Sequence, residues 1–459
     1  MPGPVRQSLK EAARSAVAAG HVPGAPVGHI DGARWTEDGS LVVVGWALPA
    51  RAENIFIVAD GGGSIAAAEA IQVPRPDLLN RFGEEFGPTA AAGGFLARFR
   101  NVAKPGKVSL AAEGRRTLFS ARAIEAGSDP VAHARWLFSQ PTPVHQLVER
   151  FSTVDLPAIS SVIEKRNRAL EHKKIERWDF GRPRPDPQAT VIVPLYGRWD
   201  FVEHQLLAFA DDREFNEDIE LVYVIDDPDL LAGLLSSAEE LYELYNVPFT
   251  VIWGHANRGF SGANNLGANA ASGRYLVFLN SDAFPTAPGW VGSLVRVLEE
   301  NPEFGVVAPR LLFPDGGLQH VGIEFRWNGA FGIWINDHPL LGLPAEADKV
   351  SGLCERHAVT GACMAVRRDE FDALDGFDTG YLIGDFEDSD LCLKYRRKGL
   401  LPGYFPGVEL THLERQSIKQ SGDQEFRQKV TILNAVRHQL RWGELIETLV
   451  ADEMREAAQ

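Results

Sequence analysis

Four short runs of continuously apolar residues constrain the fold of this 459-residue chain more than any other feature of its sequence. They are TVIVP from Thr190, IELVYVID from Ile219, FTVIWG from Phe249 and YLVFLN from Tyr275. Strands that are apolar at every position are buried on both faces, which is typical of a parallel sheet covered by helices. The segments between the runs have the length and pattern of helices. We therefore predict an α/β domain with a mostly parallel sheet and helices on both faces.

The rest of the chain divides into regions of different character. Residues 1–27 are expected to hold a short amphipathic helix and a linker, and residues 28–128 carry short apolar runs spaced as in an antiparallel β-sandwich. Helical segments follow over residues 129–188 and end in the proline-rich stretch GRPRPDPQ, which indicates a linker. We expect an accessory all-β sandwich domain, helical connectors, a catalytic domain over residues 189–420 and a helical extension over residues 421–459.

Two further segments allow more than one interpretation. In the predicted sandwich, Trp46, Phe95 and Arg75 are candidates for a sugar-binding face, although burial of the two aromatic rings in the core is the better-supported interpretation. The stretch from Gly329 to His357 is long for a connection in a compact domain. We expect it to form a lid that orders over a bound ligand.

Charge and composition exclude several classes of protein. The chain has 46 basic and 62 acidic residues, a formal charge of -16 that argues against nucleic-acid binding. No apolar run approaches the roughly 20 residues that span a bilayer, and the N-terminus lacks the apolar core of a secretory signal. The three cysteines form neither a disulfide framework nor a zinc motif. We expect a cytoplasmic protein, with peripheral contact at the inner face of the cell membrane left open.

Polar residues follow the apolar runs, at the places where each strand should end. They are Pro194 with Tyr196, Asp226 with Asp227, Asn257 with Arg258, and the triplet Asn280-Ser281-Asp282. Ligands of open parallel sheets bind beyond the carboxyl ends of the strands, which makes a nucleotide-binding, Rossmann-like half the natural interpretation. A single acid in such a place more often caps the next helix. Asp282, however, is placed to bind a divalent cation that bridges to a diphosphate.

A second acidic cluster begins a predicted helix further along the chain. The segment FEDSDLCLKYRRKG places Glu387, Asp388 and Asp390 before an apolar helix with a basic end. Compensation of the helix dipole explains both charge blocks without any function. Crowded carboxylates also raise the pKa of at least one member, which suits Glu387 or Asp388 as a proton acceptor. His412 follows a short strand, and a lone histidine is more often structural than a metal ligand.

Taken together, these segments resemble the family-2 glycosyltransferases, which have the GT-A fold and use nucleotide-sugar donors. The matching stretches run in the family's order from about Thr190 to Ser417: TVIVPLYG, VYVIDDPD, NRGFSGANNLGANAASGRYLVFLNSDAF, VTGACMAVRRDEFDALDGFD, FEDSDLCLKYRRKG and THLERQS. No single motif is specific, but their combination is. The resemblance implies a GT-A catalytic domain behind the β-sandwich.

The resemblance also implies roles for individual residues. The nucleotide-sugar donor is expected to contact Pro194, Tyr196, Asp226, Asn257, Arg258, Asn265 and Ser281. Asp282 and His412 are implied as ligands of Mn2+ or Mg2+, and Asp388, beside Glu387, as the catalytic base. Two departures from the family pattern bear on the donor: Asn280 opens the triplet in place of an aspartate, and Asp226-Asp227-Pro228-Asp229 replaces the usual DNGSxD. The base of the nucleotide is therefore left open among UDP, dTDP and GDP.

These roles imply a single displacement with inversion at the anomeric carbon. A diphosphate held by a cation needs no protonation, so that one carboxylate suffices, whereas glycoside hydrolysis usually needs two. The implied acceptor is a glycan, glycolipid or polysaccharide of the bacterial cell envelope, and homo-oligomerisation is left open. One alternative is a sugar nucleotidyltransferase, but the segment VPLYGRWDF lacks the expected glycine-rich basic loop. The other is a catalytically silent glycan-binding protein, for which loss of Asp282 and Asp388 would be the signature.

Overall fold

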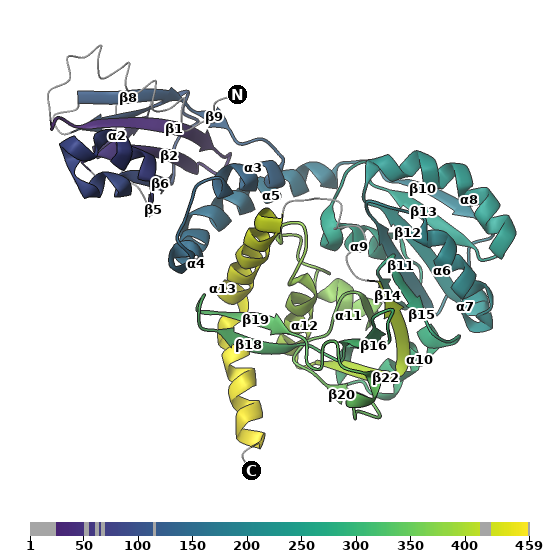
Figure 1. Ribbon diagram of the computed structural model, residues 1–459. Helices are drawn as coiled ribbons and strands as arrows, with labels where there is room; N and C mark the ends of the chain where they lie inside the picture. The colour runs from purple at the N-terminus through teal and green to yellow at the C-terminus, as the bar shows by residue number, and fades with distance from the viewer. Residues whose placement is uncertain are drawn as a thin grey trace. The chain divides into compact units, whose positions relative to one another are not determined.

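The computed structural model describes residues 24–49, 55–59, 64–65, 69–112, 116–413 and 424–457 of the chain. The chain divides into two compact units, Met1–Arg168 and Ala169–Gln459. Figure 1 labels the elements of both units. The helix expected within the first 20 residues lies outside the described residues.

The first unit contains a β-sandwich. Its larger sheet has the strand order β5-β6-β2-β1-β9: β5 (Glu69–Val73), β6 (Gly94–Phe99), β2 (Leu41–Leu48), β1 (Val27–Trp35) and β9 (Ile124–Glu125). The smaller sheet has the order β4-β3-β7-β8: β4 (Ser64–Ile65), β3 (Ile55–Ala59), β7 (Lys107–Ala112) and β8 (Arg116–Arg122). Buried residues of the two sheets, among them Val43, Phe99 and Leu110, pack into one core. The predicted all-β sandwich is confirmed.

The residues considered for a sugar-binding face are part of this fold. Trp46 is completely buried beneath α2 (Pro76–Phe86), which covers the outer face of the larger sheet. Phe95 packs against the sandwich core. Arg75 is also buried, and its guanidinium donates a hydrogen bond to the Asp31 carboxylate at 2.8 Å. None of the three side chains is therefore displayed for sugar binding.

Helices follow the sandwich, as predicted, but the second unit begins earlier than the prolines suggest. After α3 (Pro130–Phe138) and α5 (Leu156–Glu171), strand β10 (Glu176–Phe180) already pairs antiparallel with β13 (Phe249–Trp253) of the second unit. The expected boundary at residue 188 is corrected accordingly, because residues 181–188 only connect two strands of one sheet. The sequence of β10, ERWDF, alternates between half-buried and exposed positions. This edge strand therefore contains no apolar run that would predict it.

The second unit is built on an 11-stranded sheet with the main order β10-β13-β12-β11-β14-β21-β16-β22-β15. Beyond β10 and β13, its strands are β12 (Ile219–Ile225), β11 (Ala189–Leu195), β14 (Tyr275–Leu279), β21 (Cys363–Arg367), β16 (Phe304–Leu312), β22 (Leu401–His412) and β15 (Ala283–Pro285). Two short strands extend it, β17 (Leu318–His320) beside β16 and β20 (Cys354–Glu355) beside β22. The four apolar runs of the sequence are β11, β12, β13 and β14, which are parallel to one another.

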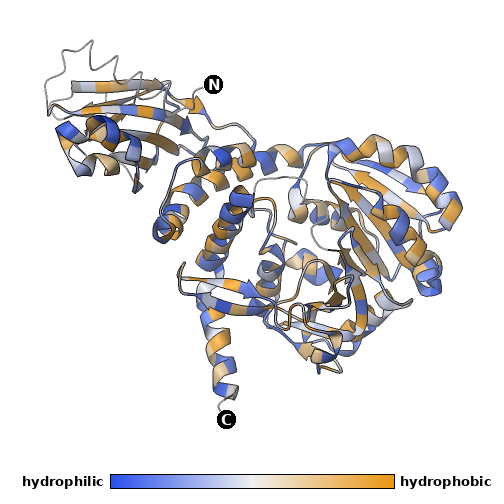
Figure 2. Ribbon diagram, in the orientation of Figure 1, coloured by the Kyte–Doolittle hydropathy of each residue, from blue (hydrophilic) through white to orange (hydrophobic). Residues whose placement is uncertain are grey.

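Helices bury both faces of this sheet. One face packs against α6 (Phe201–Ala210), α8 (Leu231–Tyr245) and α10 (Trp290–Glu300). The other packs against α9 (Gly259–Ala270), α12 (Glu387–Arg397) and α13 (Gln424–Ala457). In Figure 2 the central strands are mostly apolar along their length, whereas the helices carry apolar and polar stripes. The predicted α/β arrangement, with helices on both faces, is confirmed.

Glycines let α9 approach the sheet closely. A Cβ atom at Gly267 would lie 2.4 Å from Cγ2 of Ile192 and 2.9 Å from Cγ2 of Val224. At Gly273 it would lie 2.5 Å from the backbone of Ala189 and Thr190. All three distances are too short for contacts of a real Cβ atom. The close helix packing that the small residues of this segment predict is therefore present.

The predicted lid begins with the turn and the second strand of a β-hairpin, whose first strand precedes it. Strands β18 (Glu324–Asn328) and β19 (Ile333–Asp337) pair antiparallel. Trp334 packs against the core beneath α12 and α13, and its backbone N–H donates to Gln439 of α13 at 3.0 Å. These contacts attach the hairpin to the C-terminal helix.

In the described part of the chain no helix combines the length and hydropathy needed to cross a bilayer.

We expect Gly267→Ala to destabilise the second unit by about 1–2 kcal/mol. Overpacking typically costs about 1–3 kcal/mol, of which alanine recovers up to about 1 kcal/mol through its better helix propensity. Gly329→Ala is the matched control, because a Cβ there meets no atom within 4 Å. Equal unfolding midpoints in urea for the two variants would contradict this packing.

Candidate active site

The carboxyl ends of the parallel strands meet at one edge of the sheet. The last residues of β11 and β12, Leu195 and Ile225, are direct partners in the ladder. The Asp226 N–H then donates to the Leu195 carbonyl at 2.9 Å. Tyr196 and Asn280 follow the ends of β11 and β14. The polar clusters predicted from separate parts of the sequence therefore lie along one edge.

Asp282 and His412 face each other at this edge. Strand β15 places Ala283 opposite His412 of β22, which fixes the preceding Asp282 beside the imidazole. Asp282 Oδ1 lies 3.1 Å from His412 Nε2, and Asn280 Nδ2 lies 3.2 Å from the same nitrogen. Both side chains are buried, with exposed fractions of 7% for Asp282 and 8% for His412. The structure thus brings together the two predicted metal ligands.

Gln319 fixes which nitrogen of His412 carries a proton. Gln319 Nε2 donates to the backbone carbonyl of His412 at 3.4 Å, which turns the amide oxygen toward the imidazole. That oxygen lies 2.7 Å from Nδ1, and because it can only accept, Nδ1 is the donor. In the neutral imidazole, Nε2 is then the nitrogen without a proton, and it faces the Asp282 carboxylate 3.1 Å away. A cation between the two atoms removes their repulsion, and the hydrogen bond at Nδ1 is the usual support of a metal-ligating histidine.

The geometry fits an octahedral cation bound together with a diphosphate. Two adjacent ligands with bonds of about 2.1 Å lie about 3 Å apart, close to the separation of Asp282 Oδ1 and His412 Nε2. Among the described residues, no three His, Cys, Asp or Glu side chains form a group that could hold a metal ion. Mg2+ and similar ions accept few protein ligands and complete their shell with phosphate oxygens and water. The donor set therefore fits Mn2+ or Mg2+ and lacks the ligands of a structural zinc site.

A short backbone segment, residues 360–362, connects this pair to Asp388. The N–H of Gly361 donates to Asp388 Oδ2 at 3.0 Å, and the N–H of Asn280 donates to the Ala362 carbonyl at 2.9 Å. Asp388 lies in the first turn of α12 and is half-buried. The predicted base and the predicted metal ligands therefore flank one segment.

Burial shifts the acidity of the two neighbouring carboxyl groups to different extents. Burial and the charge of Asp385 raise the pKa of Asp388, against hydrogen bonds from the backbone of Gly361 and Ser389 that lower it. Burial raises the pKa of Glu387 well above its ordinary value, and the charges of Asp388 and Asp385 raise it further. Glu387 Oε2 is buried without a hydrogen-bond partner among the described residues. Asp388, whose negative charge is hydrogen-bonded, is therefore the carboxyl that ionises first.

Asp226 holds the start of α9. Its two carboxylate oxygens accept hydrogen bonds from the backbone N–H groups of Arg258 at 2.5 Å and Gly259 at 3.0 Å. Asn257 is exposed, and its side-chain oxygen accepts from the same Gly259 N–H at 3.1 Å. The Arg258 guanidinium donates to the Gly254 carbonyl at 3.1 Å. Asp226 thus has the helix-anchoring role, which is the commoner role of an acid after a strand.

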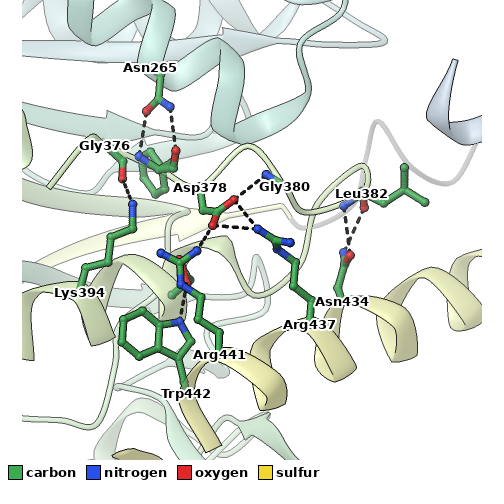
Figure 3. A network of polar contacts seen from close by, with 12 residues as sticks. Asn265, Gly376, Asp378, Gly380, Leu382, Lys394, Asn434, Arg437, Arg441 and Trp442 are labelled. Atoms are coloured by element: carbon green, nitrogen blue, oxygen red, sulfur yellow. Dashed lines mark hydrogen bonds and ion pairs between the residues drawn. The ribbon is translucent and has the colours of Figure 1, made fainter. Parts of the chain in front are cut away.

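The position of Asn265 does not match its implied role as a donor contact. Its Nδ2 donates to the Phe377 carbonyl at 2.8 Å and its Oδ1 accepts from the Phe377 N–H at 2.9 Å, as Figure 3 shows. Both polar groups are therefore occupied by the backbone of a neighbouring loop. Asp390 is likewise structural: it is completely buried, accepts a hydrogen bond from the Trp442 indole and forms an ion pair with Arg441 at 3.2 Å.

The remaining predicted donor contacts lie at the strand ends. Pro194 is half-buried at the end of β11, Tyr196 is 51% exposed directly after it, and Ser281 is buried between Asn280 and Asp282. Arg198, for which no role was predicted, pairs with Asp200 and interacts electrostatically with Asp282. Its position shortly after the end of β11 could have indicated a role at the strand ends.

A second residue without an assigned role is His338, which follows β19. Its charge lowers the pKa of Asp388. Its ring also lies 5.8 Å from that of the buried His320, centroid to centroid. Because His338 and Asp388 are distant in sequence, no local pattern indicated that they interact.

Comparisons with known proteins identify the family that the second unit resembles. Residues 190–374 match the sequence profile of glycosyl transferase family 2. The O-antigen biosynthesis protein RfbC of Myxococcus xanthus is 30% identical over 242 residues, which cover 51% of this chain and 18% of that protein. The uncharacterised protein y4gI of Sinorhizobium fredii (strain NBRC 101917 / NGR234) is 35% identical over 162 residues, 34% of this chain and 17% of that protein. The chain thus spans less than a fifth of the length of these curated relatives.

Solved structures with similar folds include two glycosyltransferase complexes. GalNAc-T7 with UDP, GalNAc and Mn2+ has a TM-score of 0.45 at 18% identity, over 57% of this chain and 50% of that chain. The mannosyltransferase PcManGT of Pyrobaculum calidifontis, in complex with GDP-Man and Mn2+, has a TM-score of 0.36 at 17% identity, over 69% and 93%. The family match and the observed sheet establish what the resemblance predicted: over residues 190–374 this chain carries a glycosyltransferase domain of family 2, with the GT-A fold.

Proposed function

We propose that the second unit transfers a sugar from a nucleoside diphosphate donor to a hydroxyl group of a glycan acceptor, with inversion at the anomeric carbon. The observation that carries the proposal is the linkage of the Asp282–His412 pair to Asp388 through residues 360–362. The pair suits a cation that binds the leaving diphosphate, and Asp388 suits the acceptance of a proton. Glycosyl transfer from such a donor requires both functions.

Asp282 and His412 would hold Mn2+ or Mg2+, with Asn280 beside them. The cation, when bound, neutralises the charge that develops on the leaving diphosphate. Gln319 keeps His412 Nε2 free to serve as a ligand. Arg198 adds a positive charge near Asp282, and a guanidinium binds phosphate oxygens well.

Asp388 acts as the base in this proposal. Its carboxylate takes the proton of the acceptor hydroxyl while the hydroxyl oxygen bonds to the anomeric carbon and the bond to the diphosphate breaks. Backbone N–H groups of Gly361 and Ser389 orient the carboxylate at 3.0 and 2.8 Å. The raised pKa of Glu387 disfavours a second ionised carboxylate, which a retaining double displacement would use as its nucleophile.

We assign the nucleotide to the ends of β11 and β12 and the acceptor to the side of Asp388. Tyr196 offers an exposed ring next to Pro194, and Asp226 holds Asn257 and Arg258 at the start of α9. The donor would be a UDP-, dTDP- or GDP-linked sugar. The identity to a protein named for O-antigen biosynthesis supports a growing polysaccharide or glycolipid as acceptor.

Loss of either proposed ligand should abolish the metal-dependent binding of nucleotides. We expect UDP, dTDP or GDP to raise the melting temperature only when Mn2+ is present, since a ligand of the folded state stabilises it. Asp282→Asn and His412→Ala should remove this shift, and Gln319→Leu should weaken Mn2+ binding roughly 10- to 100-fold. His145→Ala, at an exposed histidine of the first unit, is the control. An unchanged Mn2+ dependence in His412→Ala would exclude this cation site.

Removal of the base should stop chemistry and spare binding. Asp388→Asn is expected to lower the rate of nucleoside diphosphate release from the nucleotide sugar by roughly 10²- to 10⁴-fold. The thermal shift with nucleoside diphosphate and Mn2+ should remain. Asp211→Asn, at an exposed aspartate, is the control. Wild-type turnover in Asp388→Asn, or a transfer product that keeps the donor's anomeric configuration by NMR, would contradict the proposal.

The acid limb of the rate profile should follow the ionisation of Asp388. The base must be deprotonated, and its raised pKa places the loss of activity at a pH above the ordinary aspartate value of 3.8. Asp385→Asn removes a negative charge that raises this pKa, so that the acid limb should move to lower pH. Asparagine also tolerates the left-handed backbone at this position, where φ is 83°. A limb that stays in place or moves upward in this variant would exclude Asp388 as the titrating group.

A further inference from the structure

The loop that leads into Asp388 has a strained backbone. We call residues 374–386 the base loop, because α12 and its base follow directly. Ile383, Asp385 and Phe386 have φ angles of 67°, 83° and 75°. Non-glycine residues adopt this left-handed region rarely, and a β-branched residue such as isoleucine does so at a particular cost. Such a conformation persists only where surrounding groups hold it.

Asn434 of α13 holds this strained part of the base loop. Its side chain is almost completely buried, at 1% exposure. Nδ2 donates to the carbonyls of Leu382 at 3.0 Å and Gly384 at 2.6 Å, while Oδ1 accepts from the Leu382 N–H at 3.1 Å. Figure 3 shows the amide of Asn434 facing the backbone of Leu382. One side chain therefore fixes both backbone groups of the residue that precedes Ile383.

Neighbouring residues hold the rest of the base loop from three helices. Arg437 of α13 pairs with Asp378 at 3.0 Å, and Arg441 also contacts that carboxylate. Lys394 of α12 donates to the Gly376 carbonyl at 2.6 Å, and Asn265 of α9 binds the Phe377 backbone. Figure 3 shows these contacts along one stretch of the loop. Among the described residues, only Asn434 acts on the residues next to the left-handed segment through several backbone hydrogen bonds.

We propose that Asn434 is a positioning residue for the transfer reaction, which sets the orientation of Asp388 by holding the backbone of residues 382–384, next to the left-handed Ile383, Asp385 and Phe386. The inference rests on the proposed function, because it concerns the aim of the proposed base. The hydrogen bonds of the Asn434 side chain go to the base loop and not to Asp388 itself. Its effect reaches Asp388 along a chain path of only a few residues, through Phe386 and the start of α12.

The amide group, rather than the size of the side chain, is what this role requires. Asparagine supplies two donors and an acceptor on one rigid group, as the carbonyls and the N–H of the loop demand. A carboxylate in its place would have no donor for the carbonyls of Leu382 and Gly384. We therefore choose Asn434→Asp, which keeps the shape, and Asn434→Leu, which keeps the volume. Leu440→Ala is the control, at a 64% exposed position of the same helix.

The experiment separates positioning from folding by three readouts. In Asn434→Leu, which removes the acceptor of the Leu382 N–H, we expect hydrogen exchange of the Leu382 amide to accelerate at least tenfold, while the amides of α13 keep their protection. Asn434→Asp keeps that acceptor and loses only the donors to the carbonyls of Leu382 and Gly384. We expect kcat for nucleoside diphosphate release to fall by about 100-fold, as for a misplaced catalytic group, with unchanged binding of nucleoside diphosphate and Mn2+ in the thermal-shift assay. The acid limb should also move, because a loosened loop alters the contacts of Asp388 with Asp385, Glu387 and His338.

The possible results discriminate between the claims. Normal kcat and an unmoved acid limb in both variants would overturn the inference, as would loss of binding and turnover together in proportion to lost folding. Failure of the wild-type protein to release nucleoside diphosphate from any donor would instead overturn the proposed function. Slow exchange of the Leu382 amide in Asn434→Leu would overturn the inference in either case.

Discussion

Two backbone hydrogen bonds to residues 360–362 unite the site of this protein. The Ala362 carbonyl accepts from Asn280, at the end of a parallel strand, and the Gly361 N–H donates to Asp388, at the start of a helix on the far side. A Cβ atom at Gly361 would lie only 3.1 Å from the Phe260 ring and 3.3 Å from Asp388, so that glycine permits the approach. These hydrogen bonds therefore connect the strand end that carries Asn280 to the helix that carries Asp388.

The two sides of the arrangement solve different electrostatic problems. Asp282 Oδ1 and His412 Nε2 lie 3.1 Å apart, close enough to bind one cation together. Asp388 must remain ionised although it is surrounded by protein and by other acidic groups, and backbone N–H groups compensate part of that cost. Burial and the neighbouring carboxylates raise the pKa of Glu387 well above its ordinary value, and its Oε2 has no hydrogen-bond partner among the described residues. This difference between adjacent carboxyl groups supports the proposal that Asp388 alone serves as the base.

Much of this fold could be predicted from the sequence, because strands buried on both faces are apolar at nearly every position. Asp282 and Asp388 could also be singled out from the sequence. One follows a strand and the other lies at the start of a helix, and both are local features. The edge strand β10 was missed, since its partly exposed residues carry no apolar run. The position of Asn265 could not be foreseen, because its partner Phe377 is 112 residues away and no pattern links them. The contacts of Asn434 with the base loop could not be predicted either, because its partner Leu382 is 52 residues away.

A crystal structure of the protein with Mn2+ and a nucleoside diphosphate, in which anomalous scattering locates the manganese, is the decisive test of this site. We expect one manganese ion with bonds of about 2.1 Å to Asp282 and His412, its diphosphate on the side of Arg198, and the Asp388 carboxyl facing the same ligand. A manganese ion bound elsewhere, or an Asp388 side chain that points away from the bound diphosphate, would refute the proposed arrangement.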